Sequence, residues 1–413
     1  MTEAPARRRL AAALAVFAAA FALRAACVLR QGPPVLEGDA AQYLAYADSL
    51  AERGVFEGPR GDRATRMPGY PLFLAAAGRS PRTVEWTQAV LGALTCAVIY
   101  FWTLGLLRPR WALACALAAA AYADLIVPAG WVMTETLYSF LLAASFCVLY
   151  VEELSPGLRA ALSGLGFGLT VLVRPEVLPF AFLILAASPF LLKGFAKRHA
   201  ALGLALFLGF AAAWTVRNWR VVGRPLPAST TSGFNFYFGL RYPLDKQGLQ
   251  LGPLPSPAGN ELERDAAFKQ AFLDLRRSVP AVRIVKAYLF NVLTVYYPFL
   301  PEYDWTYVVL VPFWLFGIVI ARRRRALLPP AALVAGLSAV FAILAGPVSR
   351  YRFGFAPCLI VLAGAGAQEL FDRLGKKRFT RATAAWLAAN LGVWLFAGSF
   401  RSVVLGLKSA IWR

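Results

Sequence analysis

The stretch ARRRLAAALAVFAAAFALRAACVLR, residues 6–30, joins a basic flank to an apolar run long enough to cross a lipid bilayer. A transmembrane helix needs roughly 20 apolar residues, and this run meets that length. A cleaved signal peptide begins with a similar basic flank but has a shorter apolar core. Because further apolar runs follow along the chain, we predict that this segment is retained as the first transmembrane helix.

The rest of the chain repeats the same pattern of apolar blocks. Apolar residues make up 59% of the 413 positions and charged residues 16%, whereas soluble domains are nearer half apolar and a quarter charged. Blocks without amphipathic spacing are typical of helices that meet lipid on all sides. The predicted fold class is an all-α polytopic membrane protein with about 11 transmembrane helices, placed near residues 10–29, 86–107, 111–127, 134–151, 158–174, 177–192, 200–216, 305–321, 327–345, 354–370 and 383–400.

The net charge of +21 would suggest nucleic-acid binding in a soluble protein. Here the basic residues gather in short connections that all fall on one side of the predicted topology: Arg7–Arg9, Arg108 with Arg110, Lys193 to Arg198, Arg322–Arg325 and Lys376–Arg381. The positive-inside bias makes that side cytoplasmic. We therefore predict a multi-pass protein of the bacterial inner (plasma) membrane, with a cytoplasmic N-terminus, the lipid bilayer as a partner and no nucleic acid.

Two long segments, residues 30–85 and 217–304, fall on the opposite, periplasmic side and carry most of the carboxylates. Loops of this length in a compact protein are usually functional, so we expect the active site there. The predicted organisation has three parts. Residues 1–216 form a transmembrane catalytic module that includes the first loop, residues 217–304 form a periplasmic loop, and residues 305–413 form the C-terminal transmembrane helices.

Surface helices are expected in the first and fourth outside loops. The stretch DAAQYLAYADSLAERGVF (39–56) has apolar residues at helical spacing but is too short and too charged to span, and Gly54 is placed to end it. The stretch PGYPLFLAAAG (68–78) predicts a second surface or re-entrant piece. Residues 281–299 fit a surface helix or a further span. Because a span would break the downstream charge pattern, we predict a surface helix.

Two acids are candidates for catalysis. Asp39 opens the first surface helix, where an exposed carboxylate can act as a general base, although Asp is also a preferred helix N-cap. Glu135 begins the fourth span, where an acid near membrane depth is often functional and is also favoured by the helix dipole. No metal-ligand cluster is apparent in the sequence. A divalent cation (Mg, Mn, Ca or Zn) held jointly by the two acids is left open, since carboxylates suit hard cations.

Arginines at the outer interface suit a phosphate, because the guanidinium fork matches its oxygens: Arg66, Arg174, Arg217, Arg350 and Arg352. The alternative is that they reach for lipid headgroups. Arg24, near the outer end of the first span, fits either role. His199 is the only histidine and falls in a cytoplasmic cluster. A Ser-His-Asp triad is therefore excluded from the outer face.

Several motifs follow one another in order: GDAAQYLAYADSLAERGVF (38–56), RMPGYPLFLA (66–75), TETL (134–137), LVRP (172–175) and WTVRNWRVVGRPLPASTTSGFNFYFG (214–239). Together with SRYRFGFAP (349–357), they resemble the C-type membrane glycosyltransferases. The resemblance is to the bacterial branch that includes the protein O-mannosyltransferases and the lipid A aminoarabinose transferase. It runs from the first span to about residue 240 and weakens to a topology match beyond it, apart from the last motif.

This resemblance implies an inverting glycosyltransferase that moves a sugar from a polyprenyl-phosphate donor to a glycan, lipid or protein acceptor. It implies that Asp39 is the catalytic base and that Glu135 orients the acceptor or holds a metal. The arginines would lie near the donor phosphate. Candidate substrate-binding side chains in the same motifs are Tyr43, Tyr70, Asn218, Asn235 and Tyr237. The sequence has a single acid at the Asp39 position and no inserted lectin-like domain, which leaves the acceptor open.

A membrane transporter or flippase of lipid-linked or small substrates is the main alternative. Transporters usually carry helices broken at the midplane and weak internal repeats. Neither feature is evident in the sequence, and the large polar outside loops are unusual for that class. The sequence therefore favours the transferase.

Overall fold

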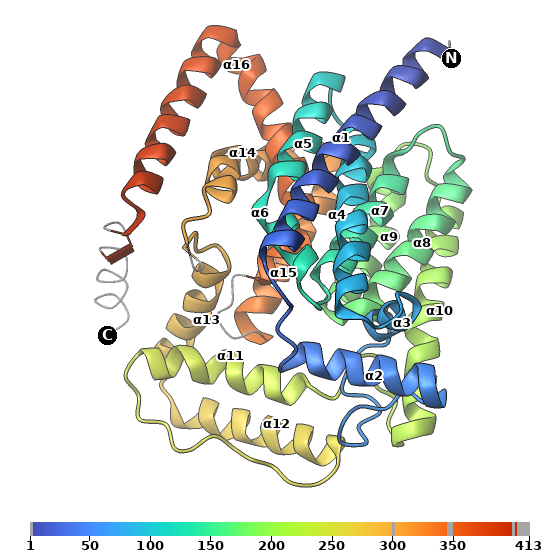
Figure 1. Cartoon of the computed structure of the whole chain (residues 1–413), viewed down its shortest axis with the longest axis vertical. Coiled ribbons are helices and arrows are strands. Elements are labelled where there is room, and N and C mark those ends of the chain that lie inside the picture. The colour runs from blue at the N-terminus through green and yellow to red at the C-terminus, as the bar shows by residue number, and fades with distance from the viewer. Residues whose placement is uncertain (1–2, 300–301, 345–349, 399–400, 403–413) are drawn as a thin grey trace.

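The computed structural model describes residues 3–299, 302–344, 350–398 and 401–402, and most of these residues are helical. Within these ranges there is no β-strand beyond one isolated bridge between Phe299 and Tyr303. Figure 1 shows a bundle of long helices with three shorter helices lying across one end, which are α2 (Asp39–Arg53), α11 (Ser232–Lys246) and α12 (Glu261–Ser278). The all-α fold class is therefore confirmed.

Six helices in the described part of the chain are long and apolar enough to cross a membrane. They are α1 (Glu3–Arg30), α4 (Pro81–Leu104), α8 (Pro156–Val173), α10 (Lys197–Val222), α15 (Leu328–Leu344) with the turn η3 before it (Arg325–Leu327), and α16 (Tyr351–Leu395). By length and composition, the chain is thus a multi-pass membrane protein.

The remaining apolar helices are bent or shorter. Helices α5 (Pro109–Ala121) and α6 (Ala123–Ile126), the latter continued by η1 (Val127–Gly130), form a pair bent by 68° that makes a seventh span if counted as one. Shorter apolar helices are α7 (Glu135–Tyr150), α9 (Leu178–Leu191, after η2, Pro175–Val177) and α14 (Trp305–Ala321). All eleven predicted spans overlap one of these helices, but the count of about 11 crossings stays a prediction.

Helix α16 contains two of the predicted spans because it folds back on itself. Gly375 has a φ of 72° inside the helix, a left-handed conformation that glycine adopts without a steric penalty. Figure 1 shows the two arms of α16 running in opposite directions from this bend. The first arm packs against α14, where Gly366 leaves so little room that a Cβ would lie 2.0 Å from the Phe313 carbonyl oxygen. Small residues permit this kind of close helix packing in membranes.

Arg24 neither reaches for headgroups nor faces the outer surface. Its side chain is fully buried and donates to the carbonyl oxygens of Ala119 and Ala120, and to that of Ala20 in its own helix. The last carbonyls of a helix have no partner within the helix, and α5 ends at Ala121 before the 68° bend. Arg24 therefore satisfies the backbone groups that this bend leaves free.

The two segments predicted to lie outside the membrane, residues 30–85 and 217–304, contain helices where they were expected. Helix α2 ends at Gly54, whose φ of 66° forms a left-handed cap, and α3 (Gly69–Ala76) follows it. Helix α13 (Ala281–Val295) carries an exposed apolar stripe that suits contact with lipid, formed by Val282, Val285, Leu289 and Leu293. Whether these helices lie on the membrane surface stays a prediction.

The three-part division of the chain also stays a prediction, and contacts cross both of its boundaries. Asn291 in the second part donates to the carbonyl oxygen of Ala342 in the third. Arg350 in the third part reaches Asp39 in the first.

Candidate active site

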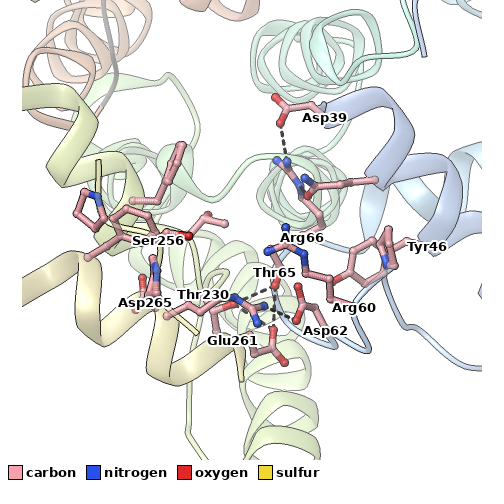
Figure 2. A pocket seen from close by; sticks show the side chains of 18 residues that line it. Asp39, Tyr46, Arg60, Asp62, Thr65, Arg66, Thr230, Ser256, Glu261 and Asp265 are labelled. Atoms are coloured by element: carbon pink, nitrogen blue, oxygen red, sulfur yellow. Dashed lines mark hydrogen bonds and ion pairs between the residues drawn. The ribbon is translucent and has the colours of Figure 1, made fainter. Parts of the chain in front are cut away.

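The Asp39 carboxylate is shared by two arginines that come from distant parts of the chain. Arg66, between α2 and α3, places Nη2 at 2.5 Å from Oδ1, and Arg350, directly before α16, places Nη2 at 3.1 Å from Oδ2. Figure 2 shows Asp39 facing Arg66 at the start of α2. The N-cap position is Gly38, and no side chain caps this helix. Asp39 is thus turned toward the arginines and does not cap its own helix.

One face of α2 holds the Arg66 guanidinium in place. Arg66 Nε donates to Gln42 Oε1 at 3.0 Å, and the guanidinium carbon lies 5.0 Å from the centre of the Tyr43 ring. Asp39, Gln42 and Tyr43 stand at positions i, i+3 and i+4, which share one side of a helix. The Tyr43 ring packs edge-on against Tyr70, with centroids 5.1 Å apart. The predicted residues Tyr43 and Tyr70 therefore support the cluster around Asp39.

The arginines keep Asp39 ionised. Burial alone would raise the pKa of its carboxyl, but the charges and hydrogen bonds of Arg66 and Arg350 outweigh that effect. The pKa of Asp39 consequently lies below its ordinary value of 3.8. An ionised carboxylate at neutral pH has the protonation state that a general base needs.

Glu135 forms a second cluster beside the first. It is only 2% exposed, and its Oε1 lies 3.7 Å from Nη1 of Arg174, which also pairs with Glu176 at 2.9 Å. The Arg174 and Arg350 guanidiniums lie over the same ring, Tyr351, at 5.6 and 6.0 Å from its centre. This ring links the Glu135 and Asp39 clusters.

Two polar atoms in these clusters are buried and have no hydrogen-bond partner among the described residues, namely Glu135 Oε2 and Arg350 Nε. Buried polar groups in native structures are almost always paired, so these two atoms can still take a hydrogen-bond partner. Arg350 Nε offers a donor to an anion, and Glu135 Oε2 offers an acceptor to a hydroxyl or an amine.

Two cavities meet at Asp39, which lines both of them. The first, of about 490 Å³, is rich in charged and hydroxyl side chains from α2, α11, α12 and the segments between them, and Arg66 faces it. The second, of about 550 Å³, lies between the loop after α1 and the end of η1, and Arg350 faces it. Its wall is mostly apolar and includes Pro33, Pro34, Val35, Val127, Trp131, Val132 and Met133. Asp39 thus stands between a polar cavity and an apolar one.

Glu261, at the start of α12, fixes the segment that carries Arg66. Its carboxylate accepts from the backbone N–H groups of Arg63 and Ala64, both at 2.9 Å, and from the hydroxyls of Thr65 and Thr230 at 3.0 and 3.1 Å. Figure 2 shows this carboxylate below Thr65 at the floor of the polar cavity. Sequence reasoning missed Glu261, because an acid in the first turn of a helix is adequately explained by the helix dipole.

Arg217 and Asn218 brace the loops without reaching Asp39. Arg217 donates to the carbonyl oxygens of Arg63, at 2.5 Å, and Phe56, at 3.3 Å. Asn218 is fully buried and donates to the carbonyl oxygen of Leu226 at 2.9 Å. Both side chains are engaged with backbone, so their predicted contact with substrate stays a prediction.

Three further candidates lie in other places. Arg352 is buried and donates to both Asp124 oxygens, at 2.6 and 3.0 Å, and to Asp304 at 2.8 Å. Tyr237 is buried and accepts from Arg241. Asn235 lines a separate cavity of about 210 Å³, together with Glu176 and Tyr351. The structure does not bring these three side chains to Asp39.

The candidate ligands for a metal ion are the side chains around Asp39 and Glu135. No cluster of three His, Cys, Asp or Glu side chains occurs in the described ranges. Asp39 and Glu135 are each engaged by an arginine, so a cation would have to displace a guanidinium. A divalent ion held by the two acids stays a prediction.

Among known proteins, no family model matches the chain, and no curated protein matches it. The chain is similar in structure to the oligosaccharyltransferase AglB of Archaeoglobus fulgidus in complex with an inhibitory peptide and a dolichol-phosphate (TM-score 0.46, 14% identity, 92% of this chain and 54% of that one). It is also similar to the apo form of the Archaeoglobus fulgidus oligosaccharyltransferase (TM-score 0.47, 15% identity, 92% and 54%).

This chain therefore spans about half the length of the structures that it matches.

Replacing Glu261 with alanine should loosen the segment that carries Arg66. The variant removes the acceptor of the Arg63 and Ala64 amides, so hydrogen–deuterium exchange of these two amides should speed up. The free energy of unfolding should fall by about 1–3 kcal/mol, the usual cost of leaving buried donors without partners. Glu263→Ala is the matched control, because Glu263 lies in the same turn, is exposed and, within the described ranges, accepts only from the Asn260 N–H. Unchanged exchange at Arg63 and Ala64 in Glu261→Ala would refute this role.

Proposed function

We propose that the chain is an inverting glycosyltransferase that moves a sugar from a polyprenyl-phosphate donor to a glycan, lipid or protein acceptor. We place it in the bacterial inner membrane, with its site on the periplasmic face, among the C-type enzymes that its motifs resemble. One observation carries the proposal: an ionised carboxylate held by two arginines stands between a polar and an apolar cavity at one end of the helix bundle.

The apolar cavity suits the donor. Its apolar wall lies next to the end of α1, so a lipid tail can enter from the bilayer while the phosphate stops at Arg350. The unpartnered Arg350 Nε provides a free donor for that phosphate, and guanidinium groups match phosphate oxygens in shape and charge. A donor of this kind needs no nucleotide sugar on this side of the membrane.

The polar cavity suits the acceptor. An acceptor hydroxyl or amine that enters there meets Asp39, which takes its proton as the acceptor atom bonds to the anomeric carbon. The bond between that carbon and the phosphate oxygen breaks, and the lipid phosphate leaves with the bonding electrons. Arginines beside the phosphate offset its growing charge. Because attack and departure occur on opposite sides of the carbon, the anomeric configuration inverts.

The two arginines also make Asp39 sensitive to the donor. While both contact the carboxylate, they keep the pKa of Asp39 low, which makes it a weak base. A donor phosphate competes for the same guanidiniums, and each one that turns to the phosphate leaves Asp39 more basic. Donor binding thus activates the base. Glu135, with its unpartnered Oε2, is placed to orient the acceptor.

Asp39→Asn should abolish transfer while leaving membrane expression intact. Loss of general-base assistance lowers the rate by about a hundred- to ten-thousand-fold. The measurement is release of lipid phosphate from a panel of radiolabelled polyprenyl-phosphate sugars, with the protein in nanodiscs and envelope extract as acceptor. Asp48→Asn is the control, because Asp48 lies on the same helix and pairs with Arg79 near the surface. Wild-type turnover by Asp39→Asn would remove Asp39 from the mechanism, and no turnover of any donor by the wild type would favour the transporter or flippase.

Activity of the wild type should persist to low pH, and it should be lost at a higher pH when Arg66 is removed. Asp39 must be ionised to act, so activity falls as the pH drops through its pKa, which the arginines hold below 3.8. Arg66→Gln removes one guanidinium while burial remains, so the acid limb of kcat/KM should move to higher pH. In the wild type, the acid limb of kcat should lie above that of kcat/KM, because kcat reports the donor-bound enzyme.

Arg79→Gln serves as the control for this pH profile. Arg79 pairs with Asp48 and Glu52 of α2 and, among the described residues, forms no hydrogen bond or ion pair with Asp39, so its removal should leave the acid limb in place. An identical acid limb in Arg66→Gln and the wild type would contradict the electrostatic role given to Arg66.

A further inference from the structure

A fourth cavity, of about 450 Å³, lies at the opposite end of the helix bundle. It is formed by the connections that follow α4, α7 and α9 and by η3 before α15. Helix α7 begins at Glu135, beside the candidate active site, and ends at Tyr150, which lines this cavity. At 1.5 Å per residue, the 16 residues of α7 span about 24 Å, which is most of the roughly 30 Å thickness of the hydrocarbon core.

The lining of this cavity is strongly basic. Four cationic side chains, Arg159, Lys193, Arg324 and Arg325, face a single carboxylate, Glu152. Of the four, only Arg324 has a carboxylate partner within 4.0 Å in the part of the chain that the structure describes, Glu369 at 2.9 Å. The cavity therefore carries uncompensated positive charge.

Arg159 shows that this charge is built into the helix bundle. It is only 4% exposed, and its guanidinium donates to the carbonyl oxygens of Leu149 and Lys193. The ring of Phe195 lies 4.8 Å from its guanidinium carbon. A buried cation that hydrogen-bonds only to neutral carbonyl groups is costly, and an anion in the adjoining cavity would lower that cost beyond what the single carboxylate of Glu152 can do.

We propose that this cavity binds the phosphate-bearing headgroup of an anionic membrane phospholipid. The cationic groups suit a phosphodiester, and the apolar side chains Leu106, Leu191, Leu192 and Leu327 in the same lining suit the first part of an acyl chain. Basic pockets between helix ends are typical of sites for such headgroups. The lipid would hold together the ends of α4, α7 and α9, on the face opposite Asp39.

The test compares lipids on purified, delipidated protein by native mass spectrometry and thermal melting. The probes are cardiolipin, phosphatidylglycerol, phosphatidylcholine and inorganic phosphate. We expect the two anionic lipids to bind and to raise the melting temperature, and phosphatidylcholine and inorganic phosphate to do neither. The variant is Lys193→Gln/Arg325→Gln, which keeps the buried Arg159 and should bind the anionic lipids about 10- to 30-fold more weakly.

The matched control is Lys197→Gln/Arg322→Gln, which removes two exposed basic residues near the same connections that do not line the cavity. Its affinity should equal that of the wild type. An equal loss in both double variants would show a general charge effect and overturn the proposal. Equal binding of phosphatidylcholine would also overturn it, as would an inorganic phosphate effect that the cavity variant abolishes.

Discussion

The shared hydrogen bonds of the Asp39 carboxylate join the parts of this protein on which the proposed chemistry depends. They connect the start of α2 to the segment before α3 and to the residue before α16. Arg66 lies 27 positions from Asp39 in the chain, and Arg350 lies 311 positions from it. Asp39 is about one-third exposed, and ion pairs of that kind add little to stability. We infer that the arrangement matters for chemistry, because it holds a carboxylate, two guanidinium groups and two cavities at one point.

Sequence reasoning found the central residues and missed their support. Asp39, Arg66 and Arg350 were predicted from an acid in an outside loop and from isolated arginines at the interface, and the structure brings these three together. Arg352 was predicted with Arg350 but lies with Asp124 and Asp304, since residues two apart on a helix point about 200° apart. Gln42 and Glu261 went unnoticed because their partners, Arg66 and the 63–65 backbone, are defined only by tertiary contacts.

One structural feature, a broken helix, is shared with transporters, but its contacts here argue against a transporter. The break is the 68° bend between α5 and α6, and transporters use broken helices of this kind. In transporters, however, the freed backbone at such a break binds substrate or ions in a cavity. Here the Arg24 side chain occupies the carbonyl oxygens at the end of α5. The carbonyl oxygens at this break are therefore bonded to protein, whereas the two cavities that Asp39 lines are open.

In the proposed reaction, the acceptor displaces the lipid phosphate from the anomeric carbon in one step, at the wall between the two cavities and with Asp39 as the base. The most direct test is the anomeric configuration of the transferred sugar, measured by nuclear magnetic resonance on product made from a donor of known configuration. The account predicts complete inversion. Retention would require a covalent glycosyl-enzyme intermediate on a nucleophilic side chain and would contradict the role proposed for Asp39.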